Sequence, residues 1–365
     1  MSRSVLCVVF FLLGCTSLFA AKTDNNASRP ADRVDTLTVE GAVLQGQVTG
    51  LTRDGLSFSL TYGQGSIKIP YDRIEQLTTE HYYHIFYDGR ESDGRIVSIN
   101  EHRWLVVEEQ GRLERIDVDD IERFILSPRE DDSFVNRVHN YIPFWSGNLD
   151  LGLAYEQGGT NKRNVSVAAR FEYNRLRHRV VIIGAGALEN QQPPDTNWTT
   201  TKDEYLFSFE ENYYLSRKKE EFLFTSCGFD RDAIRDIQSR IYPAAGMGYK
   251  RTFSNHFWAN VQLGGGGVFN QYVTYGKEDY AALYLGSEMM YQSGYGPLFR
   301  AKFLYMPSVA SYTNAWLLRA TASVSIPLTE LFALKLSVEG IDDDNPSPNV
   351  GNNKITTDFA FSFTF

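Results

Sequence analysis

Apolar and polar residues alternate one by one along most of the chain beyond Trp145; Leu149 and Leu151, for example, flank Asp150. This period of two is typical of β-strands whose two faces meet different surroundings. Twelve such segments follow one another. Each is long enough to cross a bilayer as a tilted strand, which needs roughly 9–11 residues. We therefore predict an all-β fold, with a 12-stranded antiparallel transmembrane β-barrel over residues 145–365.

The predicted connections between these strands alternate in length. Short turns such as 174–179 and 254–256 are followed by longer polar loops such as 190–201 and 342–352. Outer-membrane barrels have short periplasmic turns and longer external loops, and an even strand number returns both ends to one side. The sequence therefore predicts an outer-membrane location, with the N-terminal part of the chain in the periplasm.

The last predicted strand has aromatic residues at alternate positions, namely Phe359, Phe361, Phe363 and Phe365. A strand of this pattern resembles the signal that the outer-membrane assembly machinery recognises. We expect this machinery and outer-membrane lipid as partners. The alternative is a soluble sandwich or lipocalin-like barrel, in which the Phe row would face the protein's own core.

The polar faces of the predicted strands carry both signs of charge in nearly equal number. A selective pore would favour one sign, and twelve strands enclose much less space than the 16–18 strands of porins. We therefore expect an occluded lumen filled by ion pairs, with a narrow channel for small solutes as the alternative. The predicted interior charges are Asp150, Glu156, Glu172, Glu204, Glu210, Glu288, Glu339 and Asp358, against Arg170, Arg240, Lys250, Arg300, Lys302, Arg319 and Lys335.

Two units of similar sequence precede the barrel. Residues 46–48 (GQV) of the first unit correspond to 94–96 (GRI) of the second. Each unit has short alternating segments broken by turn signals, which predicts a small SH3-like or Sm-like β-module. The predicted modules cover residues 35–79 and 80–127, and a linker with a short helix covers 128–144.

Nearly all of the net negative charge of the chain lies in these two modules. Residues 35–127 contain 17 Asp and Glu against 9 Arg and Lys, a net charge of −8, and the whole chain has −9. This sign argues against nucleic acid, because phosphate binding needs an excess of Lys and Arg. We expect a protein-contact module, with a periplasmic protein or a cell-wall fragment as the partner, or alternatively a plain folded spacer.

The N-terminus has the layout of a secretory signal peptide. Arg3 precedes the apolar run Val5–Leu13, and small residues at 20–21 offer a cleavage point. We predict a signal peptide over residues 1–21 and a flexible tail over 22–34. Residues 12–15 (LLGC) also resemble a lipobox, in which Cys15 would be lipidated rather than removed.

The sequence gives no sign of catalysis, of a cofactor or of a metal site. His81 and His84 are three residues apart, which places them on opposite faces of a strand. The histidines of the barrel, His178 and His256, fall at predicted inner-rim turns, the wrong end for the Ser–His pair of membrane phospholipases. We predict that the protein is not an enzyme, and a lipid-modifying enzyme is the weakest alternative.

The barrel region resembles the salt-induced outer-membrane protein family (YdiY-like), a family of unknown function. The resemblance implies an outer-membrane barrel and supplies no catalytic or ligand-binding residues. It favours a structural or stress-related role in the cell envelope, and it leaves out the two N-terminal modules. The segments that carry it are 145–148 (WSGN), 203–214 (DEYLFSFEENYY), 229–230 (FD), 239–240 (SR) and 245–249 (AGMGY).

Overall fold

The computed structural model describes residues 33–365, except 53–54, 63–65, 101–102, 157–159, 195, 217, 255, 294–295, 312–314, 330 and 344–352. The predicted signal peptide, most of the predicted tail and the question of Cys15 therefore lie outside the described residues. Among the described residues, no helix has the length and apolar character needed to cross a membrane.

The first N-terminal module is a five-stranded sheet with the order β4-β3-β2-β1-β5. One face of the sheet buries an apolar row that includes Leu37, Val48, Leu56 and Leu77. Because alternate residues of a strand point to opposite faces, most charged residues fall on the other side. Asp35 is an exception: it is fully buried and accepts a hydrogen bond from the Val48 backbone N–H. Its strands are β1 (Asp35–Val39), β2 (Ala42–Thr52), β3 (Gly55–Leu60), β4 (Ser66–Ile69) and β5 (Ile74–Thr78).

The second module is a five-stranded sheet with the order β10-β6-β7-β8-β9. The first sheet, taken from its other edge, has the order β5-β1-β2-β3-β4, so the five strands of one module correspond in sequence order to the five strands of the other. The predicted pair of small β-modules is therefore confirmed. Gly46 and Gly94 hold equivalent places, and a Cβ at either would lie within 2.5 Å of a backbone oxygen of the next strand. The strands are β6 (Tyr83–Tyr87), β7 (Arg90–Ile99), β8 (Trp104–Glu109), β9 (Arg112–Asp117) and β10 (Ile121–Leu126).

A short helix, α2 (Phe134–Tyr141), follows the second module and precedes the barrel in the sequence. It begins because Ser133 caps it: the Ser133 hydroxyl accepts a hydrogen bond from the backbone N–H of Asn136. Such a cap satisfies one of the amide groups that the first helical turn leaves without a partner.

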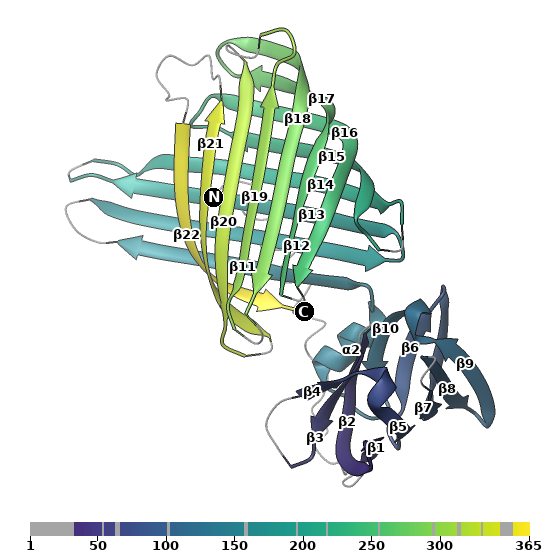
Figure 1. Cartoon of the computed structure of the whole chain (residues 1–365). Helices are drawn as coiled ribbons and strands as arrows, with labels where there is room; N and C mark the ends of the chain where they lie inside the picture. Colours follow the sequence, from purple (N-terminus) through teal and green to yellow (C-terminus); the bar gives the residue numbers. More distant parts are fainter. Residues whose placement is uncertain are drawn as a thin grey trace. The chain divides into compact units, whose positions relative to one another are not determined.

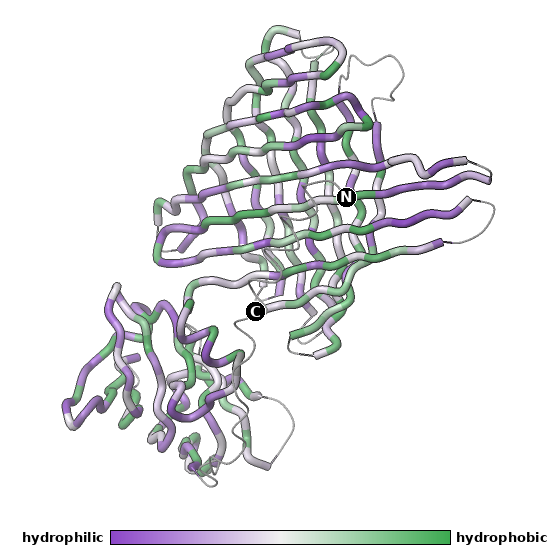
Figure 2. The backbone as a smooth tube through the Cα atoms, turned by 180° about the vertical axis from the view of Figure 1, so that it is seen from behind, coloured by the Kyte–Doolittle hydropathy of each residue, from purple (hydrophilic) through white to green (hydrophobic). Residues whose placement is uncertain are grey.

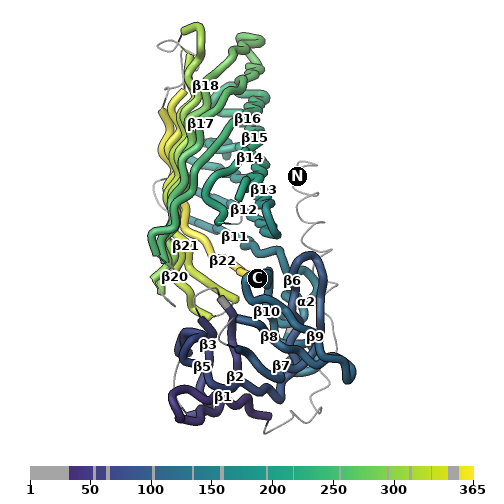
Figure 3. Tube along the Cα trace, turned by 45° about the vertical axis from the view of Figure 1, so that its right-hand side comes forward, coloured from purple at the N-terminus to yellow at the C-terminus, as the bar shows by residue number. Residues whose placement is uncertain are grey.

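The C-terminal region is a closed barrel of twelve antiparallel strands in sequence order (Figure 1). The predicted strand number and pairing are confirmed. In Figure 3, β17, β18, β20 and β21 line one side of the barrel and β13 to β16 the other. The strands are β11 (Trp145–Glu156), β12 (Asn161–Arg175), β13 (His178–Gln192), β14 (Thr199–Tyr214), β15 (Glu221–Asp232), β16 (Ile237–Ser254), β17 (Phe257–Tyr272), β18 (Gly276–Gln292), β19 (Leu298–Pro307), β20 (Trp316–Pro327), β21 (Phe332–Asp343) and β22 (Asn353–Thr364).

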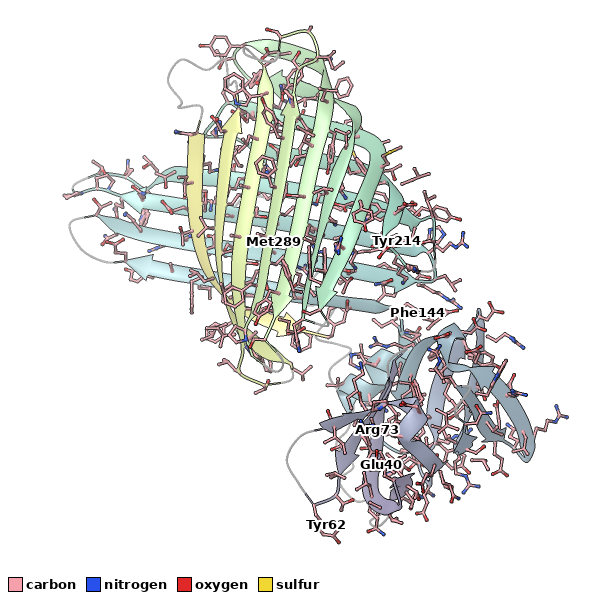
Figure 4. The ribbon with its side chains drawn as sticks, viewed as in Figure 1. Glu40, Tyr62, Arg73, Phe144, Tyr214 and Met289 are labelled. Atoms are coloured by element: carbon pink, nitrogen blue, oxygen red, sulfur yellow. The ribbon has the colours of Figure 1, made fainter. Side chains whose placement is uncertain are left out.

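The outward face of the barrel is apolar. Figure 2 shows hydrophobic and hydrophilic residues alternating along the barrel strands. Met289, labelled in Figure 4, belongs to the exposed row of β18, and Leu263 holds an equivalent place on β17. Phe359 and Phe361 are about 60% exposed, which contradicts the soluble alternative with a buried Phe row. A continuous exposed apolar belt on a closed barrel is what a bilayer would cover.

Candidate functional site

The interior of the barrel holds the buried charges of the protein, and those near the inner rim form one cluster around Glu288. Its carboxylate lies 3.1 Å from Arg179 Nη1, 3.3 Å from Arg170 Nη2 and 3.9 Å from Arg300 Nε. Glu172 joins the same cluster, 2.8 Å from Arg179 Nε and 3.1 Å from Arg170 Nη2. We call these five residues the inner cluster; they come from β12, β13, β18 and β19, so they connect opposite walls.

A second ion pair lies beside the inner cluster. Lys302 Nζ lies 2.7 Å from Glu210 Oε2, and the other carboxylate oxygen of Glu210 accepts hydrogen bonds from Asn212 and Gln262. The Tyr284 hydroxyl in turn donates to Gln262. Both carboxylate oxygens of Glu210 therefore have partners inside the barrel, as a buried charge requires.

An outer cluster of charges lies at the opposite end of the lumen. The Asp343 carboxylate forms ion pairs with the guanidinium groups of Arg240, at 2.6 Å, and Arg235, at 2.5 Å. The Asp230 carboxylate lies 3.7 Å from the Arg240 guanidinium. Arg319 connects this group to the wall, because it contacts Asp230 at 3.5 Å and Glu339 at 3.3 Å. Arg240 also donates to Asn270, and Arg319 donates to the Tyr242 hydroxyl.

The remaining interior charges form smaller groups. Lys335 Nζ lies 2.6 Å from Asp150 Oδ2. Lys354 bridges Glu204 and Asp232, and Lys202 lies 2.9 Å from Glu204 and 3.8 Å from Asp358. Lys250, near the inner rim, places its ammonium 4.5 Å from the centre of the Trp258 ring, a cation–π distance.

An apolar cluster fills much of the lumen that the charges leave. Large side chains from β14 to β20 point inward and pack against one another, so this part of the barrel has a core like that of a soluble protein. The alternation of the sequence predicted polar residues for the interior and did not reveal this cluster. Its members are Tyr214, Phe222, Phe224, Tyr242, Ala244, Val268, Ala282, Tyr284, Leu304, Met306 and Leu317.

The described part of the barrel encloses more than one separate cavity. A cavity of about 140 Å³ lies among Asp150, Glu204, Asp230, Arg319 and Lys335. The inner cluster lies on the inner side of this space and the apolar cluster beside it. The ion pairs of the inner cluster reach from β12 and β13 to β18 and β19, across the lumen.

The predicted interior charges lie inside the barrel, with one difference at the outer rim. Glu156 is exposed at the outer end of β11, where it pairs with Lys162 at 3.5 Å. Several interior charges were not among those predicted. Asp232, Arg235 and Asp343 fall in predicted loops, and Arg179 falls at a predicted turn. Lys202, Asp230 and Lys354 lie within predicted strands but were not assigned to the interior.

Strand periodicity could have found two of the missed residues. Asp343 continues the alternation of Glu339 and Ile341, and Arg179 starts the alternation that Val181 and Ile183 continue. The predicted strand at Arg179 already began at His178, as β13 does, whereas the predicted strand before Asp343 ended at Ile341 and β21 continues to Asp343. Arg235 had no such signal, because it lies between β15 and β16.

The histidines outside the barrel have structural partners. His81 Nδ1 lies 2.9 Å from Asp35 Oδ1, and His84 Nδ1 lies 3.1 Å from Asn140 Oδ1. On α2, burial lowers the pKa of His139, and the nearby positive charge of Arg123 lowers it further. Within the part of the chain that the structure describes, no three His, Cys, Asp or Glu side chains gather as a metal site would require.

The closed antiparallel barrel, its exposed apolar belt and its charged interior define the class of the protein as a membrane β-barrel of the outer-membrane type. The chain belongs to the family described as "Protein of unknown function, DUF481", whose model matches residues 149–365.

Among solved structures, the barrel is similar to the NanC porin, at 8% identity over 60% of this chain and 97% of that one, with a TM-score of 0.34. It is also similar to the translocator domain of the autotransporter NalP from Neisseria meningitidis, at 7% identity over 60% of this chain and 86% of that one, with a TM-score of 0.33. The CymD monoaromatic hydrocarbon channel matches at 9% identity over 78% of this chain and 87% of that one, with a TM-score of 0.31. Likenesses this weak do not bear on function. The search of the curated proteins found no match.

Proposed function

We propose that this protein is a non-enzymatic outer-membrane barrel whose own side chains close the lumen and which holds an acidic two-module region in the periplasm. The observation that supports this most is the inner cluster, where Glu288 contacts three arginines from three different strands. An ion crossing the lumen would have to separate these pairs. Leaving one charge buried without its partner costs about 3–5 kcal/mol, which opposes conduction through a static lumen.

The two ends of the protein have different proposed partners. The aromatic row of β22, in which Phe359 and Phe361 are exposed and Phe363 is half-buried, supports recognition by the outer-membrane assembly machinery. The acidic modules are proposed to bind a basic envelope protein or a cell-wall fragment, because their net charge of −8 favours such a partner. The resemblance to salt-induced outer-membrane proteins supports a role in the envelope under osmotic stress.

Conductance in planar bilayers tests the closed lumen. The full chain, folded into lipid and checked by heat-modifiable gel mobility, should give no stepwise currents. Glu288→Ala should introduce unstable currents, because it leaves three arginines without their shared anion. Glu211→Gln, at the inner rim and outside the lumen, is the matched control and should stay silent. Regular open-channel steps from the unmodified protein would contradict the proposal.

Binding to envelope components tests the acidic modules. The full chain in vesicles should retain a basic periplasmic protein or a cell-wall fragment, and the retention should weaken with salt. Exposed Glu40 and Glu91 are suitable sites for charge reversal, since their side chains are 69% and 68% exposed. Binding that is unchanged in Glu40→Lys/Glu91→Lys, or no binding at all, would argue against this part.

A narrow channel for small solutes is the second candidate. The cavity of about 140 Å³ in the middle of the lumen favours it, because a closed barrel needs no such space. The same conductance measurement separates the two candidates. No reaction is proposed, and a lipid-modifying activity would need a nucleophile beside a base, which the charged pairs described above do not supply.

A further inference from the structure

The seam that closes the barrel is paired along less than half of its length. The β11–β22 ladder covers Asn148–Leu151 against Phe361–Thr364, and Gly147 exchanges two further backbone hydrogen bonds with Phe365. β11 continues to Glu156 and pairs with β12 along its whole length, but beyond Leu151 its described residues have no ladder partner in β22. Figure 1 shows β11 and β22 converging near the C-terminus and diverging towards their other ends.

An open seam has a physical consequence in a membrane. Each free strand edge presents backbone N–H and C=O groups, and such edges are not stable against hydrocarbon. The outer half of this seam must therefore be filled by something that offers polar groups to the edges. The filling must also offer apolar surface to the neighbouring lipid-facing side chains.

A cavity of about 510 Å³ lies directly behind the open part of the seam. Consecutive residues of β22, from Asn353 to Asp358, line it, so it includes residues from both faces of that strand. These residues belong to the part of β22 that has no ladder partner in β11. Its other wall comes from β12 to β15, and among the described residues none from β11 contributes.

The lining of this cavity carries both signs of charge. Three acids, Glu189, Asp232 and Asp358, face Lys202 and Lys354. The sixth charged residue of the lining, Arg235, is already paired with Asp343 outside it. Lys354 lies 2.7 Å from Asp232, and Lys202 lies 3.8 Å from Asp358, so acids and bases alternate across the cavity. A ligand head that carries an ammonium and a phosphate matches this arrangement better than an anion does.

The outer lips of the seam are apolar and unusually exposed. Leu153 and Ile355 are 80% and 79% exposed and Tyr155 is 63% exposed, whereas Leu151, in the paired part, is 42% exposed. These exposed apolar side chains and the charged cavity behind them together form an amphipathic site that opens towards the surrounding lipid.

We propose that the outer half of the β11–β22 seam is a lateral binding site for a bilayer lipid with a zwitterionic ammonium–phosphate head. The head lies in the charged cavity between Lys354 and Glu189, and an acyl chain leaves between Leu153 and Ile355. The inference is independent of the proposed closure of the lumen, since a lipid held at the wall does not open a conducting path.

Lipid titration of the full chain tests the site. Native mass spectrometry of the protein in detergent would measure the apparent Kd for phosphatidylethanolamine, with phosphatidylglycerol as the anionic comparison. Phosphatidylethanolamine should bind at least about tenfold more tightly, as expected for charge-assisted contacts to the ammonium. The double variant Glu189→Gln/Asp358→Asn keeps the shape of both side chains and should remove this preference. Glu211→Gln, at the inner rim, is the matched control and should keep it.

Closing the seam provides a second measurement. If the ladder continued in register, Leu153 would face Phe359, at a Cα separation of about 5.5 Å that a disulfide can span. Leu153→Cys/Phe359→Cys, made with Cys227→Ser, should lose phosphatidylethanolamine binding about tenfold when oxidised and regain it when reduced. If the disulfide does not form, the charge variants decide.

Equal binding of the two lipids by the unmodified protein would overturn the proposal. So would a preference that survives both the double variant and the oxidised seam. Heat-modifiable gel mobility would establish for each variant that the barrel is folded. A silent conductance trace would leave this result unaffected, so the failure of one proposal can be told from the failure of the other.

Discussion

The two N-terminal modules and the barrel use the same alternation of apolar and polar residues in opposite ways. In the first module, Leu37, Leu56 and Leu77 are fully buried and most charged side chains face solvent. In the barrel, Leu263 is 59% exposed whereas Arg240 is 1% exposed. The difference teaches that the period of a pattern determines which residues share a face, and that the solvent on each side determines which face is the interior.

The inverted arrangement changes what holds each region together. The modules depend on burial of apolar area, which stabilises by roughly 25 cal/mol per Å². The barrel interior depends on paired charges, and it also contains a smaller apolar cluster. A pair in such an interior contributes little relative to apolar residues of the same shape, but breaking it is costly. Substitutions of buried apolar residues and of buried charges should therefore affect the stability of the two regions differently.

The largest effect is expected from removing the central anion of the inner cluster. Glu288→Ala leaves Arg170, Arg179 and Arg300 without their shared partner and should lower the free energy of unfolding by about 3–5 kcal/mol. Urea unfolding in lipid vesicles, followed by gel mobility, would measure the change. Glu156→Ala, at the exposed outer end of β11, is the control and should stay within about 0.5 kcal/mol. Equal effects of the two variants would contradict a charge-paired lumen.

A comparable loss is expected in the core of the first module. Leu56→Ala removes a fully buried side chain and should cost about 2–5 kcal/mol. Leu263→Ala truncates the same side chain on the outer wall of the barrel, where lipid fills the space, and should cost clearly less. Thermal unfolding of the modules and of the barrel, recorded on the same full-length variants, would compare them. A larger loss of stability in Leu263→Ala than in Leu56→Ala would mean that Leu263 faces a protein core rather than lipid.

How far the sequence predicted this arrangement depends on which physical signal each residue carries. The twelve strands could be predicted because a bilayer imposes the same period on every strand from Leu149 to Phe363. The repeated modules could be predicted because Gly46 and Gly94 meet the same steric requirement in both. These signals are local, so they can be read without knowing which strands face one another.

The pairing of charges inside the barrel could not be predicted in the same way. Glu288 meets Arg170 and Arg179 across more than 100 residues of sequence, and this depends on the closure of the barrel. The inward-facing Phe222 and Phe224 were missed because an apolar residue fits either face of a membrane strand when the lumen is not filled with water. The open seam could not be predicted from the sequence either, because it depends on how many residues of β11 pair with β22, two strands at opposite ends of the barrel sequence.

A further test of the comparison replaces an exposed leucine by arginine once in the barrel and once in the second module. Leu263→Arg puts a cation on the middle of β17, in the apolar belt, and should destabilise the barrel by about 2–4 kcal/mol. Leu113→Arg, on β9 of the second module, changes a residue that is 69% exposed and should alter stability by no more than about 0.5 kcal/mol. Urea unfolding in vesicles would compare them. Similar small effects would mean that the belt around Leu263 faces water.

The smallest expected effect concerns pH, and it belongs to the helix before the barrel. Burial and the positive charge of Arg123 lower the pKa of His139, so the folded protein favours neutral His139. The stabilisation is present above the ordinary pKa of about 6.5 and is lost as pH falls through the lowered value. Unfolding at pH 5 and pH 7.5 should therefore show a pH dependence that His139→Gln reduces. Arg123→Gln should bring the His139 pKa closer to its ordinary value, and identical pH profiles for all three proteins would contradict this account.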